Sequence, residues 1–185
     1  MESKVLYIDV ETNGIGTFRP PTQRVMQISW IHSGNEYNYY VKDIKKVSPS
    51  VPHSISIQHC KEHGNSWDYI YDELEKCMED TDKIVCHNSE FDISTIAHEL
   101  KTRKSKSYKK FKILMKDFVE SESIICTMKM SIDICKIPFS NGSSYKYPKL
   151  EELYKHLFDS IPTGLHDSLE DCKVTKECYE VLECL

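Results

Sequence analysis

The stretch LYIDVETNG, residues 6–14, begins like a buried β-strand but carries two carboxylates. Because alternate residues of a strand share a face, we expect Asp9 and Glu11 to point the same way, with Cα atoms roughly 6.6 Å apart. Two like charges this close raise each other's pKa unless a positive charge lies between them. A divalent cation supplies such a charge, and hard oxygen ligands favour Mg²⁺ or Mn²⁺. The alternative is that both carboxylates are exposed at the end of the strand.

Length and composition predict one globular domain over residues 1–185. Hydrophobic residues make up 39% of the sequence and charged residues 29%, and no apolar run is long enough to span a bilayer. The first residues show no pattern of a secretory signal. We therefore expect a soluble intracellular protein, cytoplasmic or nuclear, that is neither secreted nor membrane-bound and keeps its cysteines reduced.

Cysteine and histidine spacing does not predict a zinc site. The eight cysteines include no C-x-x-C pair, which argues against both a structural zinc site and a disulfide framework. His53, His59, Cys60 and His63 lie close in sequence, but their spacing matches no common zinc motif. We interpret them as helix and loop residues.

Charge is unevenly distributed along the chain. The formal net charge is −5, which argues against a protein that coats nucleic acid by bulk charge. In residues 101–112, KTRKSKSYKKFK, seven of twelve residues are basic and none is acidic, so the remainder carries a net charge of −12. This basic segment is either a solvated surface or a patch that contacts phosphates.

Hydrophobic patterning predicts an α/β fold with a mixed sheet. Aromatic and β-branched residues indicate three early strands in an antiparallel meander, and two shorter apolar runs indicate later strands. Apolar stripes at helical spacing indicate helices between and after them. The expected strands are residues 4–11, 24–31, 36–41, 83–88 and 123–126, and the expected helices are residues 67–79, a helix N-capped by Asn88 and Ser89, a helix ending near Cys135, residues 149–158 and a C-terminal helix.

Two further carboxylates are predicted in the first turns of helices. Asp92 follows the N-cap of one helix. Asp167 with Glu170 resembles a capping box, which makes Asp167 the N-cap of the C-terminal helix and leaves His166 on the preceding loop. Asp171 then shares the buried side of that helix and points inward. The alternative explanation is the helix dipole, which stabilises an acidic residue in the first turn by only ~0.3–1 kcal/mol.

Three motifs in this order resemble those of the DEDDh family of 3′–5′ exonucleases, in the proofreading-exonuclease superfamily. YIDVETNGIG matches the first motif, D-x-E-T-x-G; CHNSEFD matches the second, H-N-x-x-F-D; and HDSLEDC matches the third, H-D-x-x-x-D. The intervening VMQISW, ICTMKM and YPKLEELYKHLF are also similar to family segments, so that the resemblance covers nearly the whole chain. It implies a ribonuclease H-like fold, in which a mixed five-stranded sheet is flanked by helices.

The resemblance also implies roles for five residues. Asp9, Glu11, Asp92 and Asp171 would hold two divalent metal ions, Mg²⁺ or Mn²⁺, roughly 3.5–4 Å apart, which stabilise the attacking and leaving oxygens of an in-line displacement. His166 would be the general base that takes a proton from the attacking water. The unperturbed pKa of histidine, about 6.5, suits that transfer near neutral pH.

A second set of residues is implied to contact the terminal nucleotide. The turn after the first strand would bring its backbone close to the nucleotide, an apolar residue would pack against the base, and a phenylalanine would offer a stacking face. Each of these residues is alternatively a turn former or a core residue. The set is Thr12, Asn13, Gly14, Ile15, Asn88 and Phe91, with a weaker indication for His87.

These observations predict a metal-dependent 3′–5′ exonuclease that acts on the 3′ end of single-stranded or frayed DNA and releases 5′-mononucleotides. An RNA-trimming exoribonuclease of the same family is the enzymatic alternative, because the motifs do not separate DNA from RNA. The alternative of another class is a catalytically silent nucleic-acid-binding module. A polymerase or replication partner is compatible with either, no polymerase motif accompanies the chain, and the sequence leaves the oligomeric state undetermined.

Overall fold

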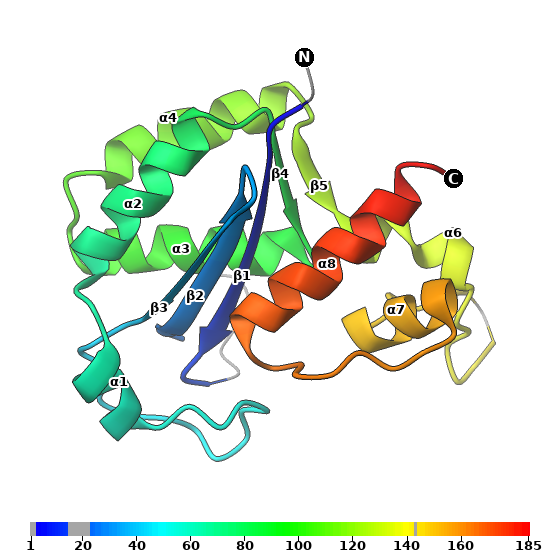
Figure 1. Ribbon diagram of the computed structural model, residues 1–185, viewed down its shortest axis with the longest axis horizontal. Helices are drawn as coiled ribbons and strands as arrows, with labels where there is room; N and C mark the ends of the chain where they lie inside the picture. Colours follow the sequence, from blue (N-terminus) through cyan, green and yellow to red (C-terminus); the bar gives the residue numbers. More distant parts are fainter. Residues whose placement is uncertain (1–2, 15–22, 143) are drawn as a thin grey trace.

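A mixed five-stranded sheet organises the chain (Figure 1). The computed structural model describes residues 3–14, 23–142 and 144–185. The strand order is β3-β2-β1-β4-β5, with β1 at the centre. β1 pairs antiparallel with β2 and parallel with β4; β2 and β3 are antiparallel, whereas β4 and β5 are parallel. The strands are β1 (Val5–Thr12), β2 (Val25–His32), β3 (Asn35–Tyr40), β4 (Lys83–Cys86) and β5 (Ile124–Cys126).

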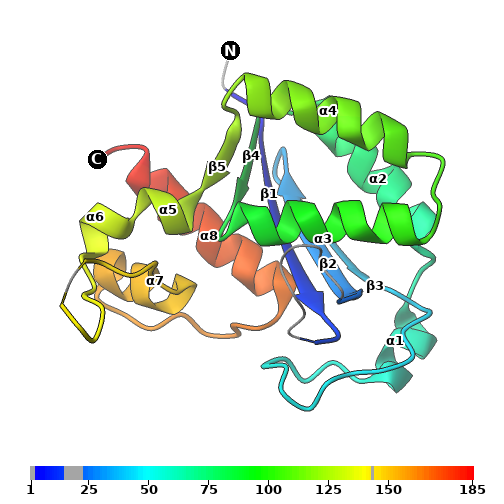
Figure 2. The same cartoon turned by 180° about the vertical axis from the view of Figure 1, so that it is seen from behind.

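Helices cover both faces of this sheet. The C-terminal helix α8 crosses one face in front of β1, and the view from behind shows α3 across the other (Figure 2). The helices are α1 (Ile57–His63), α2 (Trp67–Glu79), α3 (Ser89–Thr102), α4 (Tyr108–Glu120), α5 (Thr127–Met130), α6 (Ile132–Cys135), α7 (Leu150–Phe158) and α8 (Ser168–Leu182). The predicted fold, a mixed five-stranded sheet flanked by helices, is confirmed.

Several boundaries differ from the sequence predictions. The fourth strand ends at Cys86, because Asn88 adopts a left-handed conformation (φ 84°) as the N-cap of α3. The single helix expected to end near Cys135 is divided at Ser131 into α5 and α6. The bounds of α1 were not predicted, although its residues His59, Cys60 and His63 were interpreted as part of a helix or loop. The helix α4 was not predicted, and it includes five of the twelve residues of the basic segment 101–112.

Burial on both faces explains the composition of β2. All eight of its residues are buried, including Trp30, whose ring stacks on Tyr37 of β3 with centroids 5.0 Å apart. A strand covered on both sides loses the alternation of apolar and polar residues, so that Gln27 and Ser29 are buried as well. Buried polar side chains need hydrogen-bond partners, and these two find them at the start of α8.

The N-terminus of α8 is held on β2 by side-chain hydrogen bonds. Asp167 is the N-cap, as predicted, and its Oδ1 accepts hydrogen bonds from the backbone N–H groups of Leu169 (3.0 Å) and Glu170 (3.4 Å). Gln27 Nε2 donates to Asp167 Oδ2 at 2.8 Å, and Gln27 Oε1 accepts from the backbone N–H of Ser168 at 3.2 Å. The first turn of α8 therefore has a fixed position over the sheet.

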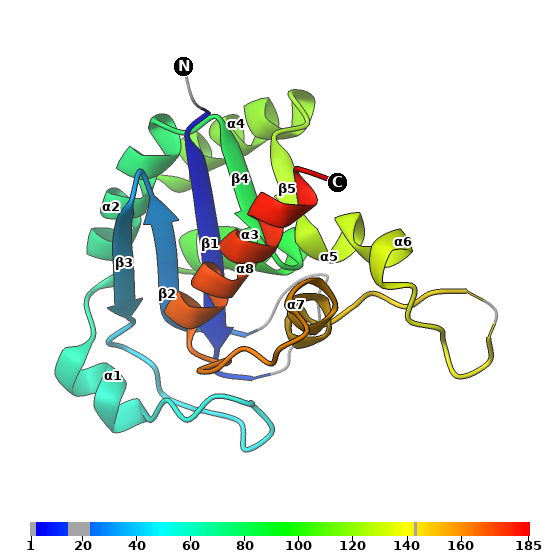
Figure 3. The same ribbon diagram turned by 45° about the vertical axis from the view of Figure 1, so that its right-hand side comes forward.

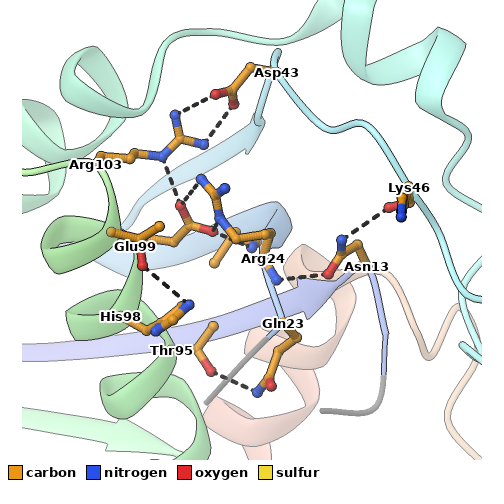
Figure 4. Close-up of polar contacts among 11 residues, drawn as sticks. Asn13, Gln23, Arg24, Asp43, Lys46, Thr95, His98, Glu99 and Arg103 are labelled. Carbon is orange, nitrogen blue, oxygen red and sulfur yellow. Dashed lines mark hydrogen bonds and ion pairs between the residues drawn. The ribbon is translucent and has the colours of Figure 1, made fainter. Parts of the chain in front are cut away.

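A buried carboxylate fixes α3 on the opposite face (Figure 4). The Glu99 side chain is fully buried and accepts hydrogen bonds from Arg24 Nε (2.7 Å), Arg103 Nε (2.7 Å) and the backbone N–H of Val25 (2.8 Å). Arg103 also holds Asp43 through two bonds of 2.7 and 2.6 Å, which lower the pKa of that carboxyl. The network joins α3 to the start of β2 and to the chain after β3.

No helix among the described residues is long and apolar enough to cross a membrane. All eight cysteines lie in the described part of the chain and are free.

Substitution Glu99→Gln is expected to lower the free energy of unfolding by about 3–5 kcal/mol, because it leaves two arginines without their buried counter-charge. Urea denaturation followed by circular dichroism measures the loss. The control is Glu79→Gln, which removes a 49% exposed partner of Lys110 and is expected to cost less than about 1 kcal/mol. Equal effects of the two substitutions would contradict a structural role for the network.

Candidate active site

The floor of the site is the acidic pair on β1. Asp9 pairs with Ser29 of β2 in the sheet register, and Glu11 pairs with Gln27. Burial raises the pKa of Asp9 well above its ordinary value, and the carboxylates of Asp92 and Asp171 raise it further. Burial likewise raises the pKa of Glu11 to about 8. Both residues therefore resist ionisation unless a positive charge is supplied.

A third carboxylate approaches from α3. Asp92 is 1% exposed in the first turn of this helix, and its Oδ2 atom has no hydrogen-bond partner among the described residues. Burial raises its pKa well above the ordinary value, while the backbone N–H groups of Val10 and Asp92 itself oppose the shift. The backbone groups and the helix N-terminus together do not compensate for the loss of hydration.

The fourth carboxylate comes from α8. Asp171 is 8% exposed, and its Oδ2 accepts a hydrogen bond from the backbone N–H of His166 at 3.2 Å. Its other oxygen, Oδ1, is buried without a partner in the described part of the chain. Burial raises its pKa to about 7. Asp171 points inward, as the position of the apolar stripe on this helix predicts.

His166 lies on the loop before α8 and faces the same group of carboxylates. Glu11, His166 and Asp171 each offer one ligand atom, and these atoms lie within 4.8 Å of one another. The backbone of His166 is left-handed (φ 72°), as is that of Gly164 (φ 76°). This turn brings the imidazole to the edge of the site without placing it in the helix.

The four carboxylates open into a cavity of about 300 Å³. His166 lines a neighbouring cavity of about 400 Å³, and its imidazole also lies within 4.8 Å of Glu11 and Asp171, which line the smaller one. The residues that line the smaller cavity are Asp9, Val10, Glu11, Thr12, Gly14, Val51, Pro52, His87, Phe91, Asp92 and Asp171.

The donor set fits a hard divalent cation. Four carboxylates meet where burial raises the pKa of each, and repulsion from neighbouring carboxylates raises it further. The buried, unpartnered oxygens Asp92 Oδ2 and Asp171 Oδ1 supply lone pairs that no described donor satisfies. A bound cation would stabilise the ionised carboxylates and would also accept the lone pairs of the unpartnered oxygens.

Predicted nucleotide contacts lie in different places. Thr12, Gly14 and Phe91 line the cavity, and Thr12 Oγ1 donates to the Gly14 carbonyl oxygen at 3.0 Å. Asn88 supplies the left-handed N-cap of α3 but makes no side-chain capping bond. Ile15 lies outside the described residues.

Asn13 does not line the cavity. Its Oδ1 accepts from the backbone N–H of Arg24 (2.7 Å), and its Nδ2 donates to the carbonyl oxygen of Lys46 (3.0 Å; Figure 4). Its backbone N–H and carbonyl also bond within the protein, to Arg24 and Ser48. These contacts shape the turn after β1, and a contact of Asn13 with nucleotide stays a prediction.

Sequence reasoning missed His53. The side chain is 8% exposed, its Nδ1 accepts from the backbone N–H of Ile55 (3.2 Å), and its Nε2 therefore donates to the carbonyl oxygen of Thr12 (2.7 Å). This bond holds Val51 and Pro52 against the end of β1, where they line the cavity. A histidine directly after Pro52 in the loop VSPSVPHS was the local signal.

Comparison with solved structures shows the same fold. The chain is similar to E. coli Exonuclease I in complex with a dA16 oligonucleotide (TM-score 0.69, 16% identity), covering 99% of this chain and 41% of that one. The zinc ion bound form of the E. coli enzyme with single-stranded DNA gives the same values. Cell-death related nuclease 4 gives a TM-score of 0.65 and 13% identity, covering 98% of this chain and 64% of that one. The chain thus spans about two fifths of Exonuclease I.

Sequence comparison with family models identifies the family of the chain, whereas comparison with individual curated proteins does not. No curated protein matches the chain in sequence. A family model described as an exonuclease, RNase_T, matches residues 6–179, which is almost the full length. Within this span lie all three DEDDh motifs, and the fold is that of the Exonuclease I structures. The chain therefore belongs to the RNase T family of exonucleases, with the residue pattern of its DEDDh type.

Proposed function

We propose that the chain is a metal-dependent 3′–5′ exonuclease that hydrolyses the terminal phosphodiester bond of single-stranded or frayed DNA and releases 5′-mononucleotides. The observation that carries the proposal is the convergence of four carboxylates, three of them buried and Asp9 half-buried, beside a histidine on a loop. Two of the four have unpartnered oxygens among the described residues. Family membership supports the reaction type, and the complexes of Exonuclease I with oligonucleotides support a single-stranded substrate.

Asp9, Glu11, Asp92 and Asp171 would hold the metal. We infer two Mg²⁺ or Mn²⁺ ions, since the site offers only oxygen ligands apart from one imidazole. Such ions activate the attacking water and stabilise the charge that develops on the phosphate oxygens.

We propose that His166 acts as the general base. Its ring lies within 4.8 Å of carboxylate oxygens of Glu11 and Asp171, at the boundary between two cavities. The bond from its backbone N–H to Asp171 fixes the loop relative to the carboxylates. The imidazole can therefore take a proton from a water between these groups and pass it to the second, open cavity.

The smaller cavity would hold the terminal nucleotide. This cavity has a volume of about 300 Å³. It lies between the acidic floor and an apolar wall that includes Phe91, Val51 and Pro52. An aromatic face and apolar side chains suit a base, whereas the scissile phosphate belongs beside the carboxylates. His53 contributes indirectly, because its bond to Thr12 keeps this wall in place.

The basic segment 101–112 lies at the far end of α3 from Asp92, on the right in Figure 2. From residue 92 to residue 102 the helix rises about 15 Å. Lys110 is paired with Glu75 (2.8 Å) and Glu79 (2.5 Å), so its charge is neutralised within the protein. A contact of the remaining lysines with the nucleic-acid backbone stays a prediction.

Replacing Asp171 with Asn is expected to lower hydrolysis of a labelled single strand in Mg²⁺ or Mn²⁺ by at least about a hundredfold, since a metal ligand is worth several kcal/mol. Glu170→Gln is the matched control, because Glu170 lies one residue away but its side chain is 42% exposed and paired with Lys173.

DNA and RNA strands of one sequence are compared with and without EDTA. Faster cleavage of RNA would favour the exoribonuclease, and no cleavage by wild type would favour a silent binding module.

For His166→Gln we expect kcat to fall about 10²–10⁴-fold, because glutamine cannot accept the proton of the attacking water. The rise in melting temperature on addition of Mn²⁺ is expected to persist in this variant. Loss of that rise would instead indicate that His166 is a metal ligand. A fall in kcat of less than tenfold would contradict the role of His166 as general base.

Stability of the metal-free protein is expected to decrease as pH rises from about 4.5 to about 8. Glu11 retains its proton in the folded state up to its raised pKa of about 8, whereas the unfolded chain ionises it near 4.5, so the unfolded state is favoured increasingly across this window. Glu11→Gln removes this contribution. At pH 8 the metal-free variant is therefore expected to melt at a higher temperature than wild type and to gain less from Mn²⁺. Identical pH profiles of variant and wild type would show that Glu11 ionises freely.

A further inference from the structure

Residues 136–149, which we call the aromatic arm, connect α6 to α7 in the sequence. Those of them that the structure describes, 136–142 and 144–149, project away from the body of the molecule (Figure 3). The sequence of the arm, KIPFSNGSSYKYPK, contains three aromatic residues, three lysines and no acidic residue. The arm lies toward the same end of the sheet as the C-terminal end of β1 (Figures 1 and 3). This composition contrasts with the net negative charge of the chain.

The described part of the arm is built as two antiparallel limbs. Lys146 donates its backbone N–H to the carbonyl oxygen of Ile137 (2.8 Å), and a β-bridge joins Pro138 to Tyr145. Alternate residues of an extended chain share a face, so Tyr145 and Tyr147 lie on the same side, roughly 6.6 Å apart along the chain. Lys146 takes the opposite side, where its Nζ pairs with Glu152 of α7 at 2.5 Å.

Both tyrosines are exposed. Tyr145 is 43% exposed and Tyr147 is 52% exposed, which is unusual for large aromatic side chains so close together. Lys136 and Lys149, at the two ends of the arm, are exposed as well. Aromatic faces next to ammonium groups, with no acidic residue between them, suit bases and phosphates of a single strand.

The root of the arm is attached to the wall of the active site. His87, which lines the cavity of the four carboxylates, lies with Nε2 3.1 Å from the carbonyl oxygen of Pro148 and Nδ1 2.9 Å from Thr127 Oγ1. Burial lowers the pKa of His87 to about 4, so the ring is neutral at pH 7. A carbonyl only accepts, so Nε2 donates to Pro148 and Nδ1 accepts from Thr127. The residue next to Tyr147 is thus held by the cavity wall.

We propose that Tyr145 and Tyr147 stack on bases of a single nucleic-acid strand whose 3′-terminal nucleotide occupies the active-site cavity. This inference rests on the proposed exonuclease function and adds a second contact region for the strand behind its reacting end. His87 is a positioning residue in this arrangement. Its two hydrogen bonds fix the arm relative to the carboxylates. The bases stacked on the arm would therefore be held at a fixed position relative to the bond that is cleaved.

The test compares substrates that reach the arm with one that cannot. Wild type and the double variant Tyr145→Ala/Tyr147→Ala are assayed on a 12-nucleotide single strand and on a dinucleotide. Stacking on an aromatic ring contributes enough per base that we expect KM for the 12-mer, and Kd from fluorescence anisotropy in EDTA, to rise about tenfold or more. The ratio of kcat/KM between the 12-mer and the dinucleotide is expected to fall by the same factor.

Two further variants separate stacking from folding. Tyr145→Phe/Tyr147→Phe keeps the rings and is expected to restore the affinity for the 12-mer. Tyr69→Ala is the matched control, because Tyr69 on α2 is 47% exposed but lies outside the arm, and its KM for the 12-mer is expected to equal that of wild type. A 2-aminopurine placed near the 3′ end of the strand is expected to be quenched on binding to wild type and less so on binding to the alanine variant.

The outcomes distinguish this inference from the proposed function. If wild type cleaves the 12-mer and the alanine variant matches it in KM, Kd and quenching, the stacking role of the arm is wrong and the exonuclease stands. An equal fall in kcat/KM for the 12-mer and for the dinucleotide would also overturn the inference, because the substitutions would then have altered the active site rather than a contact with the longer strand. If wild type neither binds nor cleaves any oligonucleotide, the proposed function fails first.

Discussion

The clustering of four poorly hydrated carboxylates is the constraint on which the rest of this structure depends. Asp9, Glu11, Asp92 and Asp171 come from three elements, and burial raises the pKa of each. Such a cluster opposes folding unless a cation joins it or protons neutralise it. The stability of the site and its proposed chemistry are therefore two consequences of one electrostatic arrangement.

A rigid frame is needed to hold like charges together. On one face of the sheet, Gln27 and the N-cap Asp167 fix the first turn of α8, which carries Asp171. On the other face, the pairing of Glu99 with two arginines fixes α3, which carries Asp92 at its opposite end. Gln27 and Glu99 have hydrogen-bond partners within the protein, whereas Asp92 and Asp171 each keep one oxygen without a partner among the described residues. This difference separates groups that support the fold from groups available to a ligand.

Two histidines other than the proposed base, His166, connect loops to this frame. His53 joins the end of β1 to the apolar wall of the cavity, and His87 joins the cavity to the aromatic arm. Neither has a ring nitrogen left for a proton-transfer role, since both nitrogens of each ring are hydrogen-bonded within the protein. His166 differs from them in facing the carboxylates from an open loop. Three histidines near one site thus have three different environments.

The sequence by itself determined the α/β class, the acidic strand β1, the N-cap of α8 and the order of the motifs, because these depend on local periodicity and short-range capping. Local patterns also indicated that Asp171 points inward. They did not indicate α4, where lysines obscured the apolar stripe of Phe111, Met115 and Phe118.

Outside the three motifs, only the tertiary structure decided which distant groups meet. The bond from His53 to Thr12 spans 41 residues, and the contact from His87 to Pro148 spans 61. The hydrogen bonds of the Asn13 side chain with Arg24 and Lys46 likewise depend on the packing of separate segments. Such contacts follow from the geometry of the packed sheet and helices, which no periodicity along the chain records. The same reason explains why the two exposed tyrosines could be related to the active site only after the fold was known.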